Sequence, residues 1–201
     1  MKLTWLNKKN NDSLIIFFNG WGMDENVVKH LEPENYDVLT ICDYNSLEAL
    51  PDLSNYDKKY VVAWSMGVMV ATLFNIECDS ATAINGTPFP IHVKYGINPK
   101  IYKLMELGFD DNTKDKFIAK MFNEMPSDFI PPSRDTENRK AELTVLKSYE
   151  ANAEYQFDRV IVSNNDKIIP TESQLNYWKS PEIIEGGHCV FYGYKRWKEL
   201  L

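Results

Sequence analysis

A serine within a short motif of small residues is the clearest chemical signal in this chain of 201 residues. The motif reads Ala63-Trp64-Ser65-Met66-Gly67, with a small residue two positions before the serine and another two positions after it. This spacing is typical of a nucleophile elbow, where a tight turn projects the serine oxygen above a sheet and small neighbours avoid Cβ clashes. An ordinary strand–helix junction can have the same residues, and Ala63 stands where the usual pattern has glycine. The motif therefore predicts a nucleophile only if a base and an acid accompany the serine.

Both partners follow Ser65 in the chain, in the order acid and then base. Asp166 comes just after one apolar run, and His188 follows two glycines after the next run. The order Ser, Asp, His is one in which serine triads are assembled. Two alternatives stay open, since Asp166 is also a typical turn residue and His188 could be a surface-loop histidine. Asp158 is a rival acid, but it precedes its apolar run and would lie at the opposite edge of a sheet.

An acyl-transfer site also needs hydrogen-bond donors aimed at the oxyanion that develops during the reaction. The glycine-flanked Trp21 follows the first strongly apolar run, and its backbone N–H is one candidate donor. The backbone N–H of Met66, the residue after the proposed nucleophile, is the second candidate. The side chain of Trp21 could equally be a core tryptophan that covers the edge of the sheet.

The elements that must position these residues are short apolar runs that end in turn residues. Continuous apolar runs of four or five residues indicate strands that are buried on both faces, as in a mostly parallel sheet. In such a sheet, functional groups gather at the carboxyl ends of the strands. The runs occupy residues 14–18, 60–64, 81–84, 159–162 and 182–184.

Helical spacing replaces strand-like runs in the middle of the chain. Residues 67–74 are apolar almost all round and predict a buried helix packed on the sheet. Residues 88–150 contain no convincing strand, and we expect a helical insertion there, between a core formed by residues 1–87 and 151–201. A further helix is expected after His188. The predicted fold class is α/β, with a mostly parallel central sheet and a helical insertion.

The composition excludes several classes of protein. Apolar residues make up 44% of the chain, and 5 Trp, 11 Tyr and 10 Phe weigh against disorder. A net charge of −7 without a long basic run argues against nucleic-acid binding. No run approaches the length of a membrane span, and the N-terminus lacks the apolar core of a signal peptide. We therefore expect a soluble cytoplasmic protein.

Neither the cysteines nor the histidines indicate a metal or a disulfide framework. The three cysteines are an odd number without CxxC spacing, which favours a reducing compartment. His30 and His92 have no context comparable to that of His188 and are expected to be surface or packing residues. We expect no metal site and no cofactor.

Four blocks, taken together and in order, resemble the BioG family of pimeloyl-[acyl-carrier protein] methyl ester esterases, which have the α/β-hydrolase fold. The blocks are residues 17–24 (Phe-Phe-Asn-Gly-Trp-Gly-Met-Asp), 63–67, 84–88 (Ile-Asn-Gly-Thr-Pro) and 185–189 (Glu-Gly-Gly-His-Cys). The resemblance implies a serine carboxylesterase of biotin biosynthesis that converts pimeloyl-ACP methyl ester to pimeloyl-ACP and methanol. The catalytic residues would be Ser65, Asp166 and His188. The chain is short for the fold, so some flanking helices are expected to be reduced to loops.

The resemblance also implies how the insertion would serve the reaction. It would be a lid in which Phe117, Met121 and Phe122, together with Trp21, line an apolar tunnel for the acyl chain. The partner would be an acyl-carrier protein, which is acidic. The insertion holds ten basic and ten acidic residues, whereas the rest of the chain carries the whole −7. The expected contacts are Arg134, Arg139 and Lys140, although such charges are also typical of a merely solvated surface.

Two alternatives remain from sequence. An esterase or thioesterase of another acyl specificity would use the same triad. A non-catalytic binding protein could also be built on a degenerate hydrolase fold, but all three candidate triad residues are retained.

Overall fold

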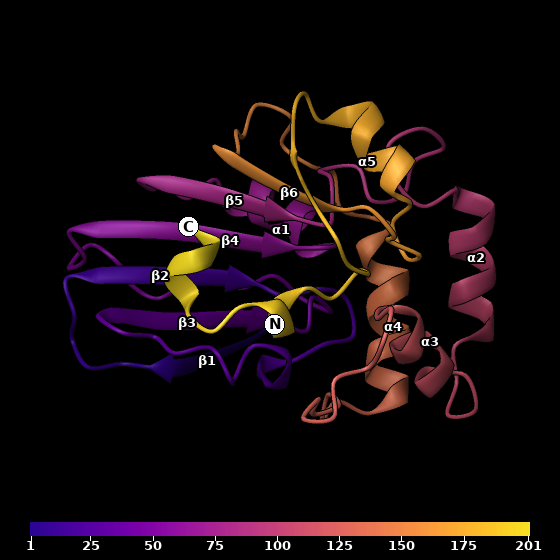
Figure 1. Ribbon diagram of the computed structural model, residues 1–201, viewed down its shortest axis with the longest axis horizontal. Coiled ribbons are helices and arrows are strands. Elements are labelled where there is room, and N and C mark those ends of the chain that lie inside the picture. The colour runs from indigo at the N-terminus through magenta and orange to yellow at the C-terminus, as the bar shows by residue number, and fades with distance from the viewer.

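A central sheet of seven strands runs through the computed structural model, which describes residues 1–201 (Figure 1). The strands lie in the order β1-β3-β2-β4-β5-β6-β7, and every neighbouring pair is parallel except β1 with β3. In chain order they are β1 Lys2–Asn7, β2 Ser13–Phe18, β3 Tyr36–Cys42, β4 Lys58–Trp64, β5 Ser80–Ile84, β6 Arg159–Ser163 and β7 Glu182–Ile184. The carboxyl ends of six strands consequently meet at one edge of the sheet.

The five strands expected from the apolar runs are confirmed as β2, β4, β5, β6 and β7, whereas β1 and β3 were not predicted. Polar residues interrupt the apolar pattern of β3, among them Asp37. The Asp37 side chain is nevertheless fully buried and accepts backbone N–H groups of Lys9, Asn10 and Asn11. A buried carboxylate with these partners is compatible with a strand, and the sequence gives no sign of them.

The sheet buries apolar side chains on both of its faces. In β2, Leu14, Ile16 and Phe18 belong to one core, and the alternating Ile15 and Phe17 belong to the other. Helix α1 (Gly67–Phe74) covers the first face, as the sequence predicted.

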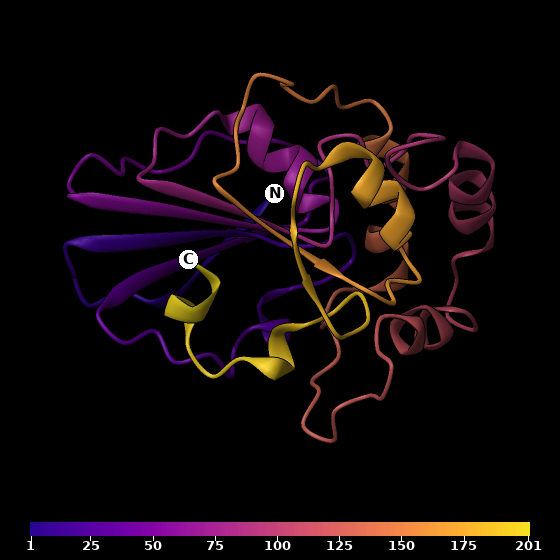
Figure 2. The same cartoon turned by 45° about the horizontal axis from the view of Figure 1, so that its top comes forward.

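The second face is covered by the C-terminal segment (Figure 2). The helix expected after His188 is absent, and two short 3₁₀ turns, Phe191–Gly193 and Trp197–Leu200, stand in its place. The Phe191 and Trp197 rings each lie 5.4 Å from the Phe17 ring in edge-on contact. Large aromatic side chains thus bury the area that a flanking helix would otherwise cover.

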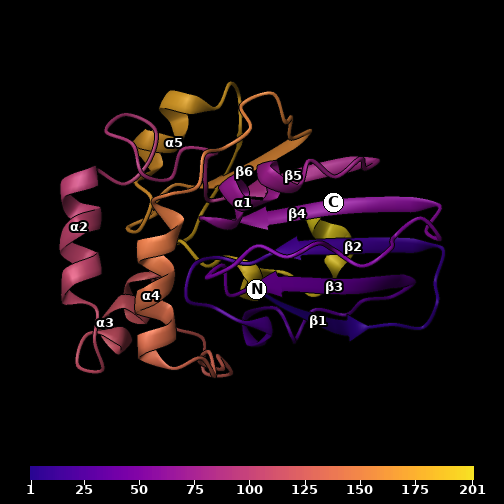
Figure 3. The same cartoon turned by 180° about the vertical axis from the view of Figure 1, so that it is seen from behind.

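Three helices lie between β5 and β6 in the chain and beyond the carboxyl ends of the strands in space (Figures 1 and 3). They are α2 Pro99–Gly108, α3 Lys114–Lys120 and α4 Thr136–Leu146. The Asp135 side chain caps α4 by accepting the backbone N–H of Asn138. We refer to residues 88–150 as the insertion. A fifth helix, α5 (Thr171–Tyr177), follows β6.

Candidate active site

Ser65 lies in the turn between the end of β4 and the start of α1. Its φ is +58°, in the left-handed region that non-glycine residues rarely adopt, and its N–H donates to the Ile84 carbonyl at 2.9 Å. A Cβ on Gly67 would collide with the backbone carbonyl oxygens of Phe18 and Asn19. The strained turn and the glycine that permits close packing are the local features expected of a nucleophile elbow.

The structure brings Ser65, His188 and Asp166 together in one hydrogen-bonded chain. Nε2 of His188 lies 2.8 Å from Oγ of Ser65, and Nδ1 lies 2.7 Å from Oδ2 of Asp166. An ionised carboxylate can only accept, so the neutral imidazole carries its proton on Nδ1 and leaves Nε2 free to accept the serine hydroxyl. The three residues are 4%, 2% and 6% exposed, respectively. This is the arrangement needed to activate a serine.

The Asp166 carboxylate is held by further donors. Its Oδ1 accepts the backbone N–H groups of Ile168 and Ile169 at 2.8 and 3.1 Å. Its Oδ2 also accepts the side-chain amide of Gln174 at 2.9 Å. The sequence does not predict this role for Gln174, because a single glutamine on a short helix gives no signal of it. The rival acid Asp158 lies at the other end of β6, exposed, and accepts a backbone N–H there.

The loop that carries His188 is fixed through its own carbonyl group. That oxygen accepts the indole N–H of Trp64 at 2.9 Å and the side-chain amide of Asn85 at 2.8 Å. The carbonyl of the Asn85 side chain in turn accepts the N–H of Ser163 at 2.7 Å. Asn85 follows β5 directly and belongs to the block at residues 84–88 that resembles the BioG family, but the sequence alone does not predict this anchoring role.

The backbone N–H groups of Trp21 and Met66, both near Ser65, have no acceptor within the protein. The other N–H groups of residues 19–23 are all bonded, for example that of Gly22 to Glu142 and that of Met23 to the Gly20 carbonyl. These are the two donors that the sequence suggested for an oxyanion. An unpaired N–H beside a buried nucleophile is free to bind an oxygen of a reacting ester.

A cavity of about 390 Å³ lies in the insertion close to this site. Two of its lining residues connect it to the site: Phe117 packs on the Trp21 ring at 4.7 Å, and the N–H of Ile168 bonds to Asp166. Its lining is mainly apolar and includes Ile97, Ile101, Leu104, Met105, Phe109, Phe117 and Ile168. We call it the insertion cavity.

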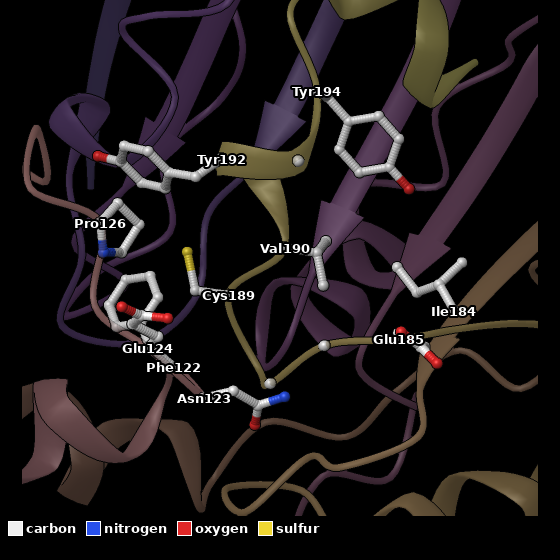
Figure 4. A pocket seen from close by; sticks show the side chains of 13 residues that line it. Phe122, Asn123, Glu124, Pro126, Ile184, Glu185, Cys189, Val190, Tyr192 and Tyr194 are labelled. Atoms are coloured by element: carbon white, nitrogen blue, oxygen red, sulfur yellow. The ribbon is translucent and has the colours of Figure 1, made fainter.

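The three residues of the insertion that were expected to line one tunnel with Trp21 are divided by the structure, which corrects that expectation. Phe117 lines the insertion cavity, but Phe122 lines a separate cavity of about 480 Å³ behind the His188 loop (Figure 4). Phe122 and Pro126 lie on one side of that second cavity and Ile184 on the opposite side. Met121 lines neither cavity; it is buried, and its carbonyl accepts the N–H of Cys189. Helical spacing through residue 122 would have placed these side chains close together, but α3 ends before Met121, and the chain then takes Met121 and Phe122 in other directions.

The basic residues expected to contact a partner are mostly buried, which overturns that prediction for two of them. Arg139 is 2% exposed, and the Arg134 side chain is 7% exposed and pairs with Glu142 and Asp43. Lys140 is half-buried. Arginine lends itself to interior ion pairs, and a charge count cannot tell a buried arginine from an exposed one. Three lysines at the insertion cavity are exposed and unpaired instead, namely Lys116, Lys120 and Lys167.

His30 and His92 lie apart from the site. Nε2 of His30 lies 3.1 Å from the Phe191 carbonyl, and the His92 ring accepts two backbone N–H groups of its own turn. No cluster of three or more His, Cys, Asp or Glu side chains could hold a metal ion. None of the helices has the length and apolar character needed to cross a lipid bilayer.

Comparison with known proteins gives a match over the whole chain. A family model described as "Pimeloyl-ACP methyl esterase BioG" matches residues 1–200. The crystal structure of BioG from Haemophilus influenzae superposes with a TM-score of 0.92 at 33% identity, over 100% of this chain and 99% of that one. A putative aryl esterase from Burkholderia cenocepacia, 16% identical with a TM-score of 0.63, covers 94% of this chain and shares the α/β-hydrolase fold.

A second relative is a larger protein. The malonyl-[acyl-carrier protein] O-methyltransferase of Bacteroides fragilis is 35% identical over 178 residues. The match covers 82% of this chain but 36% of that protein.

Proposed function

The chain belongs to the BioG family of pimeloyl-ACP methyl esterases, and from this premise we propose that it hydrolyses the methyl ester of pimeloyl-ACP methyl ester in biotin biosynthesis. The products are pimeloyl-ACP and methanol, and the enzyme acts in the cytoplasm. The observation that carries the proposal is the buried chain Ser65–His188–Asp166 beside the unpaired N–H groups of Trp21 and Met66.

In the first half of the reaction, Ser65 Oγ attacks the ester carbonyl while His188 Nε2 takes the hydroxyl proton. The carbonyl oxygen becomes an oxyanion and accepts the N–H groups of Trp21 and Met66. The tetrahedral intermediate collapses, and the imidazolium gives its proton to the methoxy oxygen, which leaves as methanol. Asp166 stabilises the imidazolium through its bond to Nδ1 without itself taking the proton.

In the second half, water attacks the acyl-enzyme with His188 as its base. The same two N–H groups stabilise the second oxyanion, and the proton on Nε2 returns to Ser65 Oγ. The carboxylic acid is released and ionises in water. No cofactor enters this cycle.

The insertion cavity suits an acyl chain that ends in an acidic carrier. Its apolar lining, which includes Phe109 and Phe117, would hold the methylene groups. Lys116, Lys120 and Lys167 stand exposed at the same cavity, and none forms an ion pair within the protein. Free cations at the mouth of an apolar cavity favour an acidic partner, even though the whole chain carries −7. The insertion would thus act as a lid that also receives the carrier.

The Bacteroides fragilis relative adds support from chemistry. Its name describes the methylation of a malonyl group bound to acyl-carrier protein, and a segment similar to this chain forms about a third of it. Methylation of a carrier-bound acid forms the kind of ester that an esterase would later remove.

The proposal is tested by mass spectrometry of pimeloyl-ACP methyl ester after incubation with the purified protein. The expected product is lighter by one methylene group and retains its thioester. Release of free carrier protein would indicate a thioesterase, and an unchanged substrate would indicate an esterase of another acyl specificity or a non-catalytic binding protein. A panel of other carrier-bound methyl esters would define the acyl specificity.

A further inference from the structure

The carboxylate of Glu142, on helix α4 of the insertion, is fully buried and bonded on both oxygens. One oxygen accepts the backbone N–H of Tyr44 at 2.6 Å, and the other accepts that of Gly22 at 3.0 Å. The guanidinium of Arg134 also donates to the second oxygen, at 2.8 Å. Burial raises the pKa of Glu142, and the Arg134 charge and the two backbone donors oppose that effect. A charge is retained in an interior only with such partners.

Gly22 is the residue after Trp21, whose own N–H is unpaired and close to Ser65. The bond from Gly22 to Glu142 therefore fixes the peptide group that follows the proposed oxyanion donor. Gly22 has a φ of +72°, and a Cβ there would lie 3.0 Å from Nε of Arg139, so the loop meets α4 closely. This conformation and approach both favour glycine.

The side chain of Trp21 is held by the same helix. Its indole N–H donates to the Arg139 carbonyl at 2.7 Å, and its ring packs on Phe109 and Phe117 at 4.9 and 4.7 Å. Helix α4 thus anchors Trp21 at two points, the indole and the following peptide group. The backbone N–H between these anchors has little freedom to turn.

We propose that Glu142 is a positioning residue that aims the Trp21 N–H at the oxyanion by holding the N–H of Gly22. The inference rests on the proposed esterase function and adds to it that the insertion is part of the catalytic apparatus and not only a cover. Figures 1 and 3 show α4 directly beyond the strand ends, where it can reach the loop after β2.

A merely structural role predicts a different outcome. Glu142 also holds Tyr44, so its loss could lower stability without affecting the reaction. An oxyanion donor acts on the transition state, so a misdirected donor lowers kcat and leaves KM nearly unchanged. The two roles are therefore separable by kinetics.

The test is Glu142→Gln, compared with wild type and with Glu137→Gln, an exposed glutamate on the same helix. The substrate is p-nitrophenyl butyrate, and kcat is calculated per active site titrated with a fluorophosphonate. We expect kcat to fall about tenfold to a hundredfold with KM within about twofold, since loss of a whole donor costs about a hundredfold to a thousandfold. A trifluoromethyl ketone, whose adduct places an oxyanion in the same position, should lose affinity by a similar factor. Glu137→Gln should match wild type.

Glu142→Asp provides a second variant if the glutamine variant folds poorly, because it keeps the charge near Arg134 but shortens the reach to Gly22. It should show the same fall in kcat. Unchanged kcat in either folded variant, or equal effects on inhibitor affinity and KM, overturns the positioning role. If the wild type is active and the Glu142 variants match it, only the positioning role of Glu142 fails. If the wild type hydrolyses neither this ester nor the carrier-bound one, the proposed function fails as well.

Discussion

The side-chain amide of Gln174 donates to the same Asp166 oxygen that accepts the Nδ1–H of His188, at 2.9 Å and 2.7 Å. The amide nitrogen also donates to the Ile169 carbonyl at 2.8 Å, and Gln174 is fully buried. Gln174 therefore fixes which oxygen of Asp166 faces the imidazole. We infer that the carboxylate is oriented by helix α5 as well as by its own turn.

Replacing Gln174 with leucine should weaken catalysis by freeing this carboxylate to rotate. A hydrogen bond to a charged group contributes about 1.5–3 kcal/mol, so kcat for p-nitrophenyl butyrate should fall about tenfold or more. Asn176→Leu, at an exposed position on the same helix, is the control and should retain full activity. Equal activity of the two variants would show that the backbone N–H groups of residues 168 and 169 suffice to hold Asp166.

Ser65→Ala should abolish turnover while the protein stays folded. Loss of a triad member costs on the order of a thousandfold or more, and alanine removes only the hydroxyl. Steady-state esterase assays and the melting temperature measure the two effects, with the exposed Ser148→Ala as control. Near-native hydrolysis by Ser65→Ala would refute the proposed mechanism.

The assignment of the acid predicts an asymmetry between two aspartates. Asp166→Asn should lower kcat heavily, because an amide favours the wrong tautomer of His188. Asp158→Asn should cost little activity, since that residue lies at the far end of β6. Comparing kcat of both variants on one ester checks the assignment, and the opposite order of effects would place the catalytic carboxylate elsewhere.

The parts of the fold predicted from sequence are those with a local signal. Runs such as residues 14–18 are uninterrupted and end in turn residues, and they became parallel strands whose ends meet. This is why Ser65, Asp166 and His188 could be expected together although they are far apart in the chain. The missed strand β3 depends on buried partners of Asp37 that only the folded chain supplies.

The parts that could not be predicted depend on burial. A count of charges does not reveal that Arg139 packs over the Phe109 ring or that Arg134 pairs with Glu142 inside the protein. Likewise, the helical spacing expected around residues 117–122 gave no indication that Phe117 and Phe122 would line different cavities. Both corrections concern long side chains whose direction is decided by tertiary contacts.

Alkaline pH should destabilise the fold through its buried phenols and thiols. Burial raises the pKa of Cys42 and Cys189 from 9.0 to about 12, and that of Tyr192 from 10.0 to about 12. The pKa of Tyr44, which donates its hydroxyl hydrogen to the backbone carbonyls of residues 19 and 41, is raised well above 10.0. These groups stay neutral in the folded protein, but in the unfolded chain they ionise at their ordinary values.

The free energy of unfolding should therefore be insensitive to these groups below about pH 9 and fall as the pH rises above it. Urea unfolding at about pH 8 and about pH 11 measures the change, and absorbance of tyrosinate follows ionisation in the folded state. An unchanged unfolding midpoint across this range would contradict the prediction.

The final prediction concerns the lysines at the insertion cavity. Lys120→Glu should raise the KM for pimeloyl-ACP methyl ester by roughly twofold to fivefold, since an exposed charge pair contributes up to about 1 kcal/mol. Hydrolysis of p-nitrophenyl butyrate should hardly change, because a surface charge acts on the encounter with the carrier and not on acyl transfer. Added salt should weaken the difference in KM between the wild type and Lys120→Glu, since screening at about 0.15 M limits the reach of exposed charges to about 8 Å.

Lys58→Glu, which makes the same change of net charge at the far end of β4, is the matched control. Equal KM values for the two variants would mean that the carrier protein docks on another surface, and equal losses on both substrates would mean that Lys120 supports the structure of the insertion.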